Sequence, residues 1–369
     1  MRRPCNSFPS LRDAINVGGT PPPDFLIGAE HRAAYGDLLR GSAITSGAED
    51  LRGRSVLIAA ADQLVAALAL IELDGLARRV ILYPLDLALE HLPYVMRYAE
   101  VDAVVSDGQA LGGASLGAVQ HALCTAALAP RSCTSDERLP TEWVLLTSGT
   151  TGRPKMVLHT LASLAGAIGA GESDAEVTWS TFYDIRRYGG LQIFLRAVLA
   201  GSSMVLAGPQ EPVANFLQRA GEAGVTHISG TPSHWRRALM SPQAGRIAPR
   251  YVRLSGEIAD QSILNSLRSF YPDARISHAF ATTEAGVAFD VRDGLSGFPA
   301  TMLTSTAGVE MKMIDATLRV RSNRTADRYL GENPPALKDA DGYVDTGDVL
   351  ELRDGRYHFQ GRRDGVINV

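Results

Sequence analysis

The residues with the clearest capacity for chemistry are the nine from Thr147 to Lys155, which read TSGTTGRPK. Backbone N–H groups converge on a phosphate only where the chain curls, and glycine permits the positive φ that such a curl needs. Hydroxyl groups add hydrogen bonds, and a lysine adds a point charge for a polyphosphate. The segment therefore predicts a phosphate-binding loop made by Thr147, Ser148, Gly149, Thr150, Thr151, Gly152 and Lys155. The alternative is an ordinary turn between two strands.

This loop differs from the Walker pattern GxxxxGK[ST]. Lys155 comes three residues after Gly152 instead of directly after it. Pro154, which lies between them, removes one amide donor and fixes φ. We therefore expect a phosphate loop of another design.

Three downstream segments place acidic side chains beside glycine or threonine: LSGE (254–257), AFATTEAG (279–286) and YVDTGD (343–348). Glu284 beside Thr283 suits a hard cation that bridges phosphates, because such a cation takes one or two carboxylates plus water. Asp348 suits a vicinal diol, because a carboxylate accepts two hydrogen bonds and needs no donor of its own. Taken singly, each segment is also typical of a strand end or a βα turn.

Taken together and in this order, the segments resemble the motifs of the adenylate-forming (AMP-binding) superfamily. This superfamily comprises acyl- and aryl-CoA synthetases, nonribosomal-peptide adenylation domains and luciferases. Its loop reads [YF]-T-S-G-[ST]-T-G-x-P-K, and LLTSGTTGRPK is similar to it. Its hinge motif G-R-x-D-x-x-I-[KN] resembles GRRDGVIN, so the resemblance covers roughly residues 50–369.

The resemblance implies the chemistry of the site. In the family the loop holds the β- and γ-phosphates of ATP. Thr283 is then expected to bond the α-phosphate and Glu284 to hold Mg²⁺, so that the expected catalytic residues are Thr283, Glu284 and Lys155. ATP and Mg²⁺ are the implied cofactors, and the acceptor is CoA or the phosphopantetheine of a carrier protein.

The resemblance also implies the contacts of the nucleoside. Phe280 is expected to stack on the adenine and Asp348 to bond both ribose hydroxyls. Ala281 is a departure, because the family usually has glycine there. Asp364 is the expected hinge about which a C-terminal lid rotates. The implied adenine- and ribose-binding residues are Ser255, Gly256, Glu257, Ala279, Phe280, Asp348 and Arg362.

The pocket for the acid is marked less clearly by the sequence than the nucleotide site. Counting back from Gly201, the His-x-x-Gly of many acyl- and aryl-CoA members falls on Arg186 and Gly189. Arg186 suits a substrate carboxylate, because a guanidinium donates two parallel hydrogen bonds. The alternative is that Arg186 and Arg187 form a solvated edge or an internal salt bridge with Asp184. The expected pocket residues are Tyr183, Arg186, Tyr188, Gly189 and Thr231. For the two tyrosines and Thr231 the alternative is a place in the core.

Composition bounds the class of protein. The chain of 369 residues has a formal net charge of −4 and a pI of about 6.1, so no basic field indicates nucleic acid. The three cysteines form no CxxC pair, and the most apolar stretch, from Ser55 to Ala77, carries acidic residues. No signal peptide or membrane span is expected, and the predicted location is the cytoplasm.

Short apolar runs alternate with helical patterns up to about residue 289, which favours βαβ units. The alternating pattern after that favours antiparallel strands. We predict an α/β fold of two stacked, mostly parallel α/β subdomains (1–289), a small antiparallel β subdomain (290–360) and the start of a hinge (361–369), with the C-terminal lid domain absent. Residues 109–140 are expected to be mostly loop.

The predicted function is ATP-dependent activation of a small carboxylic acid, followed by transfer to a thiol, in an AMP-forming acid–thiol ligase. Two alternatives stay open. One is an amino-acid adenylation domain with Asp184 holding the amino group, although the spacing from Asp184 to Gly201 is too long for that match. The other is a non-catalytic nucleotide-binding relative. Because the lid lysine of the family has no counterpart before Val369, impaired activity is expected.

Overall fold

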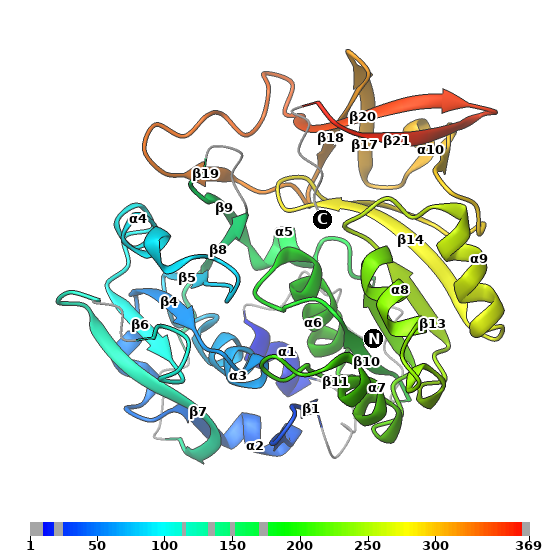
Figure 1. Ribbon diagram of the computed structural model, residues 1–369. Helices are drawn as coiled ribbons and strands as arrows, with labels where there is room; N and C mark the ends of the chain where they lie inside the picture. The colour runs from blue at the N-terminus through cyan, green and yellow to red at the C-terminus, as the bar shows by residue number, and fades with distance from the viewer. Residues whose placement is uncertain are drawn as a thin grey trace.

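The computed structural model describes residues 10–17, 25–112, 116–131, 137–147, 152–169 and 176–363. Three sheets organise these residues: two of eight strands and one of five (Figure 1). We call them the first sheet, the second sheet and the small sheet.

The first sheet carries the strands on either side of the predicted phosphate loop. Its order is β19-β9-β8-β5-β4-β6-β7-β3. β4 pairs in parallel with β5 and β6, and β5 pairs in parallel with β8, whereas β9 returns antiparallel to β8. Its strands are β3 (Gly41–Ile44), β4 (Ser55–Ala59), β5 (Arg79–Leu82), β6 (Ala103–Ser106), β7 (Gln120–Pro130), β8 (Glu142–Thr147), β9 (Lys155–Thr160) and β19 (Arg328–Leu330).

One strand of this sheet was not predicted. Residues 109–140, expected to be mostly loop, also contain β7, a strand of 11 residues. β7 pairs in parallel with β6 on one side and antiparallel with β3 on the other. Its alanine-rich sequence lacks the β-branched run that marks a central strand, and most of its side chains are half-buried or exposed.

The second sheet is parallel through its middle and antiparallel at its ends. Its order is β15-β14-β13-β12-β10-β11-β1-β2, and only the pairs β15–β14 and β1–β2 are antiparallel. Its strands are β1 (Leu26–Ile27), β2 (Arg32–Ala33), β10 (Thr178–Thr181), β11 (Ser203–Val205), β12 (His227–Gly230), β13 (Tyr251–Leu254), β14 (Arg275–Thr282) and β15 (Gly286–Val291).

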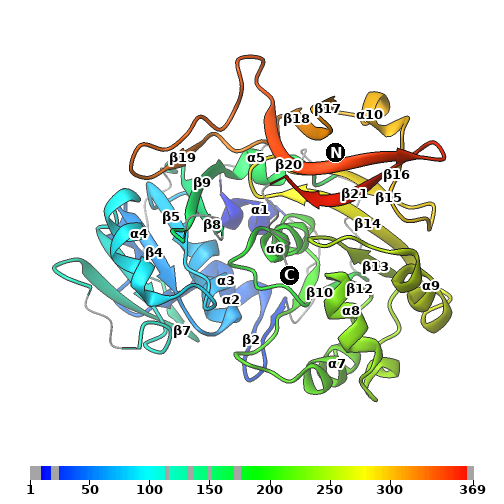
Figure 2. The ribbon, with the colours of Figure 1, turned by 45° about the horizontal axis from the view of Figure 1, so that its top comes forward.

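The small sheet is antiparallel throughout, in the order β16-β21-β20-β18-β17. Both ribbon views place it beside β14 and β15 (Figures 1 and 2), and it shares a hydrophobic cluster with β15. β19 lies in the same stretch of chain but pairs with β9, so it connects the small sheet to the first sheet. The strands of the small sheet are β16 (Phe298–Pro299), β17 (Val309–Ile314), β18 (Thr317–Ser322), β20 (Val344–Arg353) and β21 (Arg356–Arg362).

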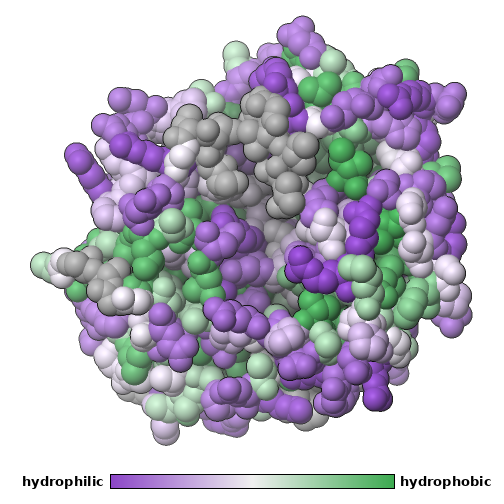
Figure 3. Space-filling model, in the orientation of Figure 1, coloured by the Kyte–Doolittle hydropathy of each residue, from purple (hydrophilic) through white to green (hydrophobic). Residues whose placement is uncertain are grey.

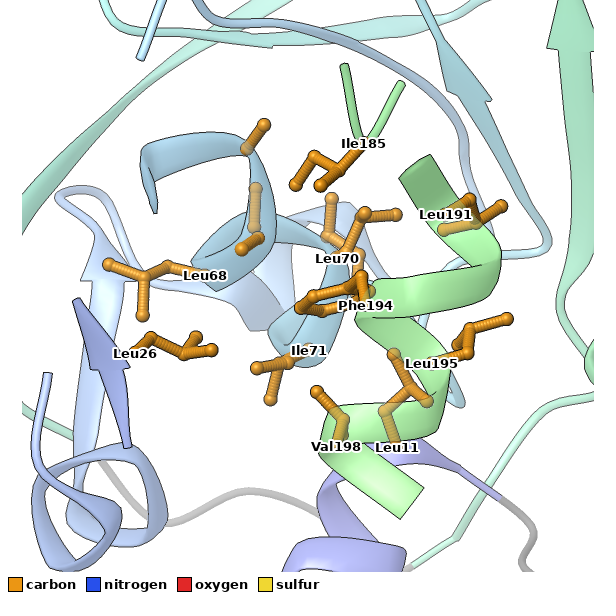
Figure 4. Close-up of a cluster of buried hydrophobic side chains, with 14 of the residues drawn as sticks. Leu11, Leu26, Leu68, Leu70, Ile71, Ile185, Leu191, Phe194, Leu195 and Val198 are labelled. Carbon is orange, nitrogen blue, oxygen red and sulfur yellow. The ribbon is translucent and has the colours of Figure 1, made fainter. Parts of the chain in front are cut away.

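The helices fill the space around these sheets. Every residue of α3 is buried, as expected for a helix that is apolar on all sides. Side chains of α3 and α6 meet in the largest hydrophobic cluster (Figure 4). The helices are α1 (Leu11–Val17), α2 (Tyr35–Arg40), α3 (Gln63–Leu73), α4 (Leu92–Tyr98), α5 (Leu161–Ala165), α6 (Tyr188–Ala200), α7 (Val213–Glu222), α8 (Pro232–Leu239), α9 (Gln261–Phe270) and α10 (Met302–Ser305), with 3₁₀ turns at Ala48–Leu51, Leu89–His91 and Ala244–Arg246.

The predicted α/β class, with two mostly parallel sheets followed by a small antiparallel one, is confirmed. Within the residues described above, no helix has both the length and the apolar character needed to cross a bilayer.

Candidate functional site

The predicted site segments follow the carboxyl ends of parallel strands. The phosphate loop follows β8, and the segments that begin at Ser255 and Thr283 follow β13 and β14. In open α/β sheets the crevice outside the carboxyl ends of the strands is the usual ligand site. The face in Figure 3 is hollowed near its centre, with hydrophilic side chains beside the hollow.

A contact chain joins the phosphate loop to the acidic motif. Lys155 Nζ, at the start of β9, lies 5.8 Å from the centre of the Tyr329 ring. The Tyr329 hydroxyl donates a hydrogen bond of 3.1 Å to Glu284 Oε1. Tyr329 lies on β19, opposite Val157 of β9, so the pairing of these two strands places it between the cation and the carboxylate.

The ribose motif is close to the same place. Asp348 of β20 is directly opposite Arg362 of β21, and opposed residues of an antiparallel pair share one face. Burial raises the pKa of Tyr329, and the charge of Glu284 adds to the rise, while the positive charge of Arg362 opposes it. Arg362 therefore lies within electrostatic reach of Tyr329. Lys155 and Glu284 thus contact Tyr329, Arg362 acts on Tyr329 electrostatically, and Asp348 stands opposite Arg362.

The turn before Asp348 is fixed by local hydrogen bonds. Asp345 accepts a bond of 2.9 Å from the Gly347 backbone N–H and is paired with Arg319 at 3.1 Å. Thr346 Oγ1 accepts from the Asp348 N–H at 3.2 Å. Asp345 and Thr346 therefore organise the turn. Burial acts to raise the pKa of Asp345, but the hydrogen bond from Gly347 and the nearby arginines together lower it. The ionised form of Asp345 is therefore favoured.

A buried histidine joins β9 to the acidic motif directly. His159 Nε2 lies 2.7 Å from the Thr283 carbonyl oxygen, so this nitrogen must donate. Its other nitrogen, Nδ1, lies 2.9 Å from Ser163 Oγ. His159 is fully buried, and burial lowers its pKa to about 4. The neutral imidazole therefore fixes the peptide beside Glu284 at a set distance from the strand that begins with Lys155.

This burial predicts how stability depends on pH. Between about pH 4 and 6.5 the unfolded chain binds a proton at His159 that the folded chain does not, so unfolding becomes easier as the pH falls through this window. The slope from this group is roughly 1.4 kcal/mol per pH unit. His159→Gln should flatten that part of the profile in denaturant titrations at pH 5 and pH 7. The exposed His31→Gln serves as the control, and equal slopes in the wild type and His159→Gln would contradict the assignment.

The predicted walls of the acid pocket come together around one tyrosine. The Tyr183 hydroxyl donates to the Ser255 carbonyl oxygen at 2.6 Å. A Cβ at Gly256, where φ is +83°, would lie 3.6 Å from Thr231 Cγ2 and 4.0 Å from Tyr183. A Cβ at Gly189 would meet the Tyr183 ring at 3.5 Å. The structure therefore brings Tyr183, Gly189 and Thr231 together with the predicted adenine turn.

The side chains of this turn also have structural partners. Glu257 accepts two hydrogen bonds from Ser233, from the N–H at 2.9 Å and from Oγ at 2.7 Å, at the start of α8. Thr231 caps the same helix by accepting from the His234 N–H at 3.0 Å. α8 thus positions both sides of the turn.

Two consecutive arginines, Arg186 and Arg187, connect the second sheet to the first sheet. Arg186 is buried, with Nε 2.7 Å from Asp184 Oδ1 and with Nη1 bonded to the Ala60 carbonyl oxygen. The internal salt bridge, one of the two interpretations left open by the sequence, is therefore present. The Nε and Nη1 atoms, which would have donated hydrogen bonds to a substrate carboxylate, are thus already bonded within the protein. Arg187 instead donates to the Leu146 carbonyl oxygen at 2.7 Å and pairs with Asp86 at 2.7 Å.

Two further residues predicted to contact ligands, Phe280 and Tyr188, lie in aromatic or buried surroundings. Phe280 stacks on Phe359, with ring centres 4.8 Å apart, and on Phe289 at 5.6 Å. Its stacking on adenine stays a prediction. Tyr188, the first residue of α6, is buried, and burial raises the pKa of its hydroxyl.

Part of the predicted site lies outside the described residues: Ser148, Gly149, Thr150, Thr151 and Asp364. At Gly152, which the structure describes, φ is +83°, as the predicted curl requires. Ala279 lies within β14, and Thr283 lies just beyond the carboxyl end of that strand.

Three residues beside the predicted site segments were not predicted. Tyr329 lies in no motif, and only the β19–β9 pairing brings it to Glu284. His159 is a single histidine in an apolar strand, which is typical of a structural residue. Arg253 stands next to the LSGE turn, and its proximity to that motif was the one available signal.

The fold and the order of these segments define a class of protein, the adenylate-forming enzymes. Residues 60–325 match the family model described as AMP-binding enzyme, which is more than half of the chain. The chain belongs to this family.

The relatives are CoA ligases and adenylation enzymes. The 2-succinylbenzoate–CoA ligase of Salmonella typhimurium is 28% identical over 235 residues, which is 60% of this chain and 47% of that relative. Acyl-CoA ligase ppsA of Aspergillus oryzae is 27% identical over 255 residues, which is 60% of this chain and 44% of that relative. The chain thus spans about half the length of the curated relatives it matches.

Solved structures show the same fold at low identity. A variant of E. coli MenE with bound OSB-AMS has a TM-score of 0.75 at 21% identity, and the match covers 99% of this chain and 79% of that one. The N-terminal subdomain of Klebsiella oxytoca NpsA in complex with 3-hydroxybenzoyl-AMSN has a TM-score of 0.72 at 17% identity, and the match covers 96% of this chain and 100% of that one.

Proposed function

We propose that this chain binds ATP with Mg²⁺ and activates a carboxylic acid as its acyl-adenylate, which then passes to the thiol of CoA or of a carrier protein. The observation that carries the proposal is the contact chain from Lys155 through Tyr329 to Glu284. It links the loop expected to hold the phosphates to the carboxylate expected to hold the metal. The similarity to CoA ligases supports the same reaction class.

In the proposed reaction a carboxylate oxygen of the acid attacks the α-phosphorus of ATP. The bond from that phosphorus to the bridging oxygen breaks, and pyrophosphate leaves with the electron pair. Such a step depends on positioning and charge stabilisation more than on a protein nucleophile. Lys155 would stabilise the charge that develops on the leaving phosphates, and Thr283 would hold the α-phosphate.

The residues present fit a magnesium ion. Glu284 and Thr283 offer only oxygen ligands, which a hard cation prefers. When bound, Mg²⁺ would supply positive charge that offsets the charge of the phosphates. Tyr329 keeps Glu284 oriented by its hydrogen bond, and Asp348 with Arg362 would hold the ribose beside it.

Amino-acid activation is the weaker candidate. The Asp184 carboxylate, which would have to hold the amino group, is paired with Arg186 at 2.7 Å. A non-catalytic nucleotide-binding protein would bind ATP without releasing pyrophosphate.

Pyrophosphate release with aliphatic, aromatic and amino acids separates these possibilities. The test also follows acyl-adenylate by mass spectrometry in a single turnover, because this detects the intermediate itself and does not depend on the rate of product release. We expect acyl-adenylate with at least one non-amino acid, dependent on Mg²⁺. ATP binding without acyl-adenylate from any acid would favour the non-catalytic alternative, and absence of ATP binding would contradict the proposal.

A further inference from the structure

A row of buried polar residues crosses the second sheet on the face toward α6. In register across β10, β12, β13 and β14 stand Thr181, Ser229, Arg253 and Ser277. All four are buried, and Arg253 is only 4% exposed. The residues that alternate with Arg253 on β13, Val252 and Leu254, belong instead to the hydrophobic cluster beneath α7, α8 and α9. The polar row is therefore confined to one face of the sheet.

Arg253 is incompletely satisfied in this row. Its Nε donates to Asp290 Oδ1 at 3.0 Å. Its Nη2 is buried and has no hydrogen-bond partner among the described residues, and the same is true of Ser229 Oγ on the neighbouring strand. Burial acts to lower the pKa of Arg253, but Asp290, Tyr251 and Tyr183 together outweigh it, so the group stays charged.

Arg253 lies on β13 two residues before Ser255, which holds the Tyr183 hydroxyl. The charge of Arg253 acts on the hydroxyls of both Tyr183 and Tyr188, opposing the rise in pKa that burial causes at each. Arg253 therefore acts electrostatically on two of the predicted walls of the acid pocket.

Other charges in this region are also mainly positive. Arg324 donates to the carbonyl oxygens of Gly166 and Val287, at 3.2 and 2.9 Å, so these bonds leave its charge unneutralised. Asp290 is the carboxylate that acts on both Arg253 and Arg324. The charge of Arg196 also lowers the pKa of Asp290, after Arg253 and against the effect of burial.

A buried cation with open donors is costly unless a ligand or water completes its hydrogen bonds. An apolar acyl chain beside Arg253 would leave that cost in place. A carboxylate would remove it, because a carboxylate oxygen accepts a charge-assisted hydrogen bond from the open Nη2 donor. Ser229 offers a further hydroxyl on the adjacent strand.

We propose that the acid activated at this site carries a second anionic group, a carboxylate in the simplest case, which Arg253 binds. The inference rests on the proposed function, because it assumes that a carboxylic acid is activated here. Arg253 would then bind the end of that acid opposite to the carboxylate that reacts with ATP. Arg253 would be a specificity residue that contacts substrate and takes no part in the transfer itself. The competing arrangement is a buried water between Arg253 and Ser229.

The test compares matched acyl groups on one adenosine scaffold. Sulfamoyladenosines bearing butanoyl and succinyl, pentanoyl and glutaryl, or hexanoyl and adipoyl groups differ within each pair only by a terminal methyl or carboxylate. Equilibrium titration requires no turnover. We expect the diacid member to bind about 10- to 100-fold more tightly in at least one pair, as for a hydrogen-bonded charge pair.

Variants assign the preference to Arg253. Arg253→Gln should abolish it while leaving the affinity of the monoacid member within about threefold. Arg253→Lys should retain part of it, because the charge remains without the planar fork. Arg219→Gln, which removes another partly buried arginine paired with Glu211 at 2.7 Å on the opposite face of the sheet, is the control and should retain all of it.

The outcomes are separable. Equal affinity within all three pairs, or a monoacid preference in the wild type, overturns the inference while leaving the proposed function standing, and it points to the buried water. A diacid preference that persists in Arg253→Gln overturns the assignment to this residue. If the wild type binds neither member of any pair nor ATP, the proposed function itself fails. Should Arg253→Gln not fold, the wild-type comparison and Arg253→Lys still decide.

Discussion

Glu284→Gln should lower pyrophosphate release at saturating ATP, acid and Mg²⁺ by about 100- to 1000-fold, the range found when a group that stabilises developing charge is removed. The substitution is close to isosteric, and the glutamine carbonyl oxygen can still accept the hydrogen bond that Tyr329 donates to Glu284. What is lost is the negative oxygen that a hard cation requires. The variant should also need a higher Mg²⁺ concentration for half-maximal rate.

Glu310→Gln is the matched control, because Glu310 is exposed on β17 and pairs with Arg321. Its rate should remain within about twofold of the wild type, as is usual for surface changes. If Glu284→Gln kept its rate and its Mg²⁺ requirement, Glu284 would not be the metal ligand and the proposed site would need another carboxylate.

Asp348→Asn should raise the KM for ATP by about 10- to 100-fold, the cost of losing hydrogen bonds to a charged acceptor. A carboxylate accepts from both hydroxyls of a vicinal diol, whereas the amide accepts at one oxygen only. The fixed turn through Asp345 and Thr346 should keep the substituted side chain in place, so that the effect measures chemistry and not unfolding.

Deoxynucleotides make this test specific to the ribose. The wild type should discriminate against 2′-deoxy-ATP and 3′-deoxy-ATP, and Asp348→Asn should lose most of that discrimination. Asp341→Asn, at an exposed residue paired with Lys312 at 3.3 Å, is the control. An equal loss for ATP and for both deoxynucleotides would mean that Asp348 does not contact the diol.

The parallel core of the fold could be predicted because its strands carry unbroken apolar runs. Val56, Leu57 and Ile58 are all fully buried, as such a run indicates. The positions of the motif residues could also be anticipated, because parallel strands deliver their carboxyl ends to one edge. β7 was not predicted because a strand rich in alanine, with most of its side chains half-buried or exposed, carries neither signal.

Contacts between distant segments could not be predicted in the same way. The place of Tyr329 beside Glu284 depends on the pairing of β19 with β9, which joins residues far apart in the chain. The sequence does not distinguish Arg186 from Arg253. In the structure Arg186 is bonded to Asp184 and to the Ala60 carbonyl oxygen, whereas Nη2 of Arg253 has no hydrogen-bond partner among the described residues. The hydrogen-bond partners of each arginine depend on side-chain packing, which a sequence motif does not predict.

The central claim is that the base of the phosphate loop, Glu284 and Asp348 face one nucleotide site. A crystal structure of the chain soaked with AMP tests it most directly. The account predicts both ribose hydroxyls within hydrogen-bond distance of Asp348, and the phosphate beside Thr283 on the side of Lys155. Bound AMP whose ribose is remote from Asp348, or whose phosphate is remote from Thr283, would contradict it.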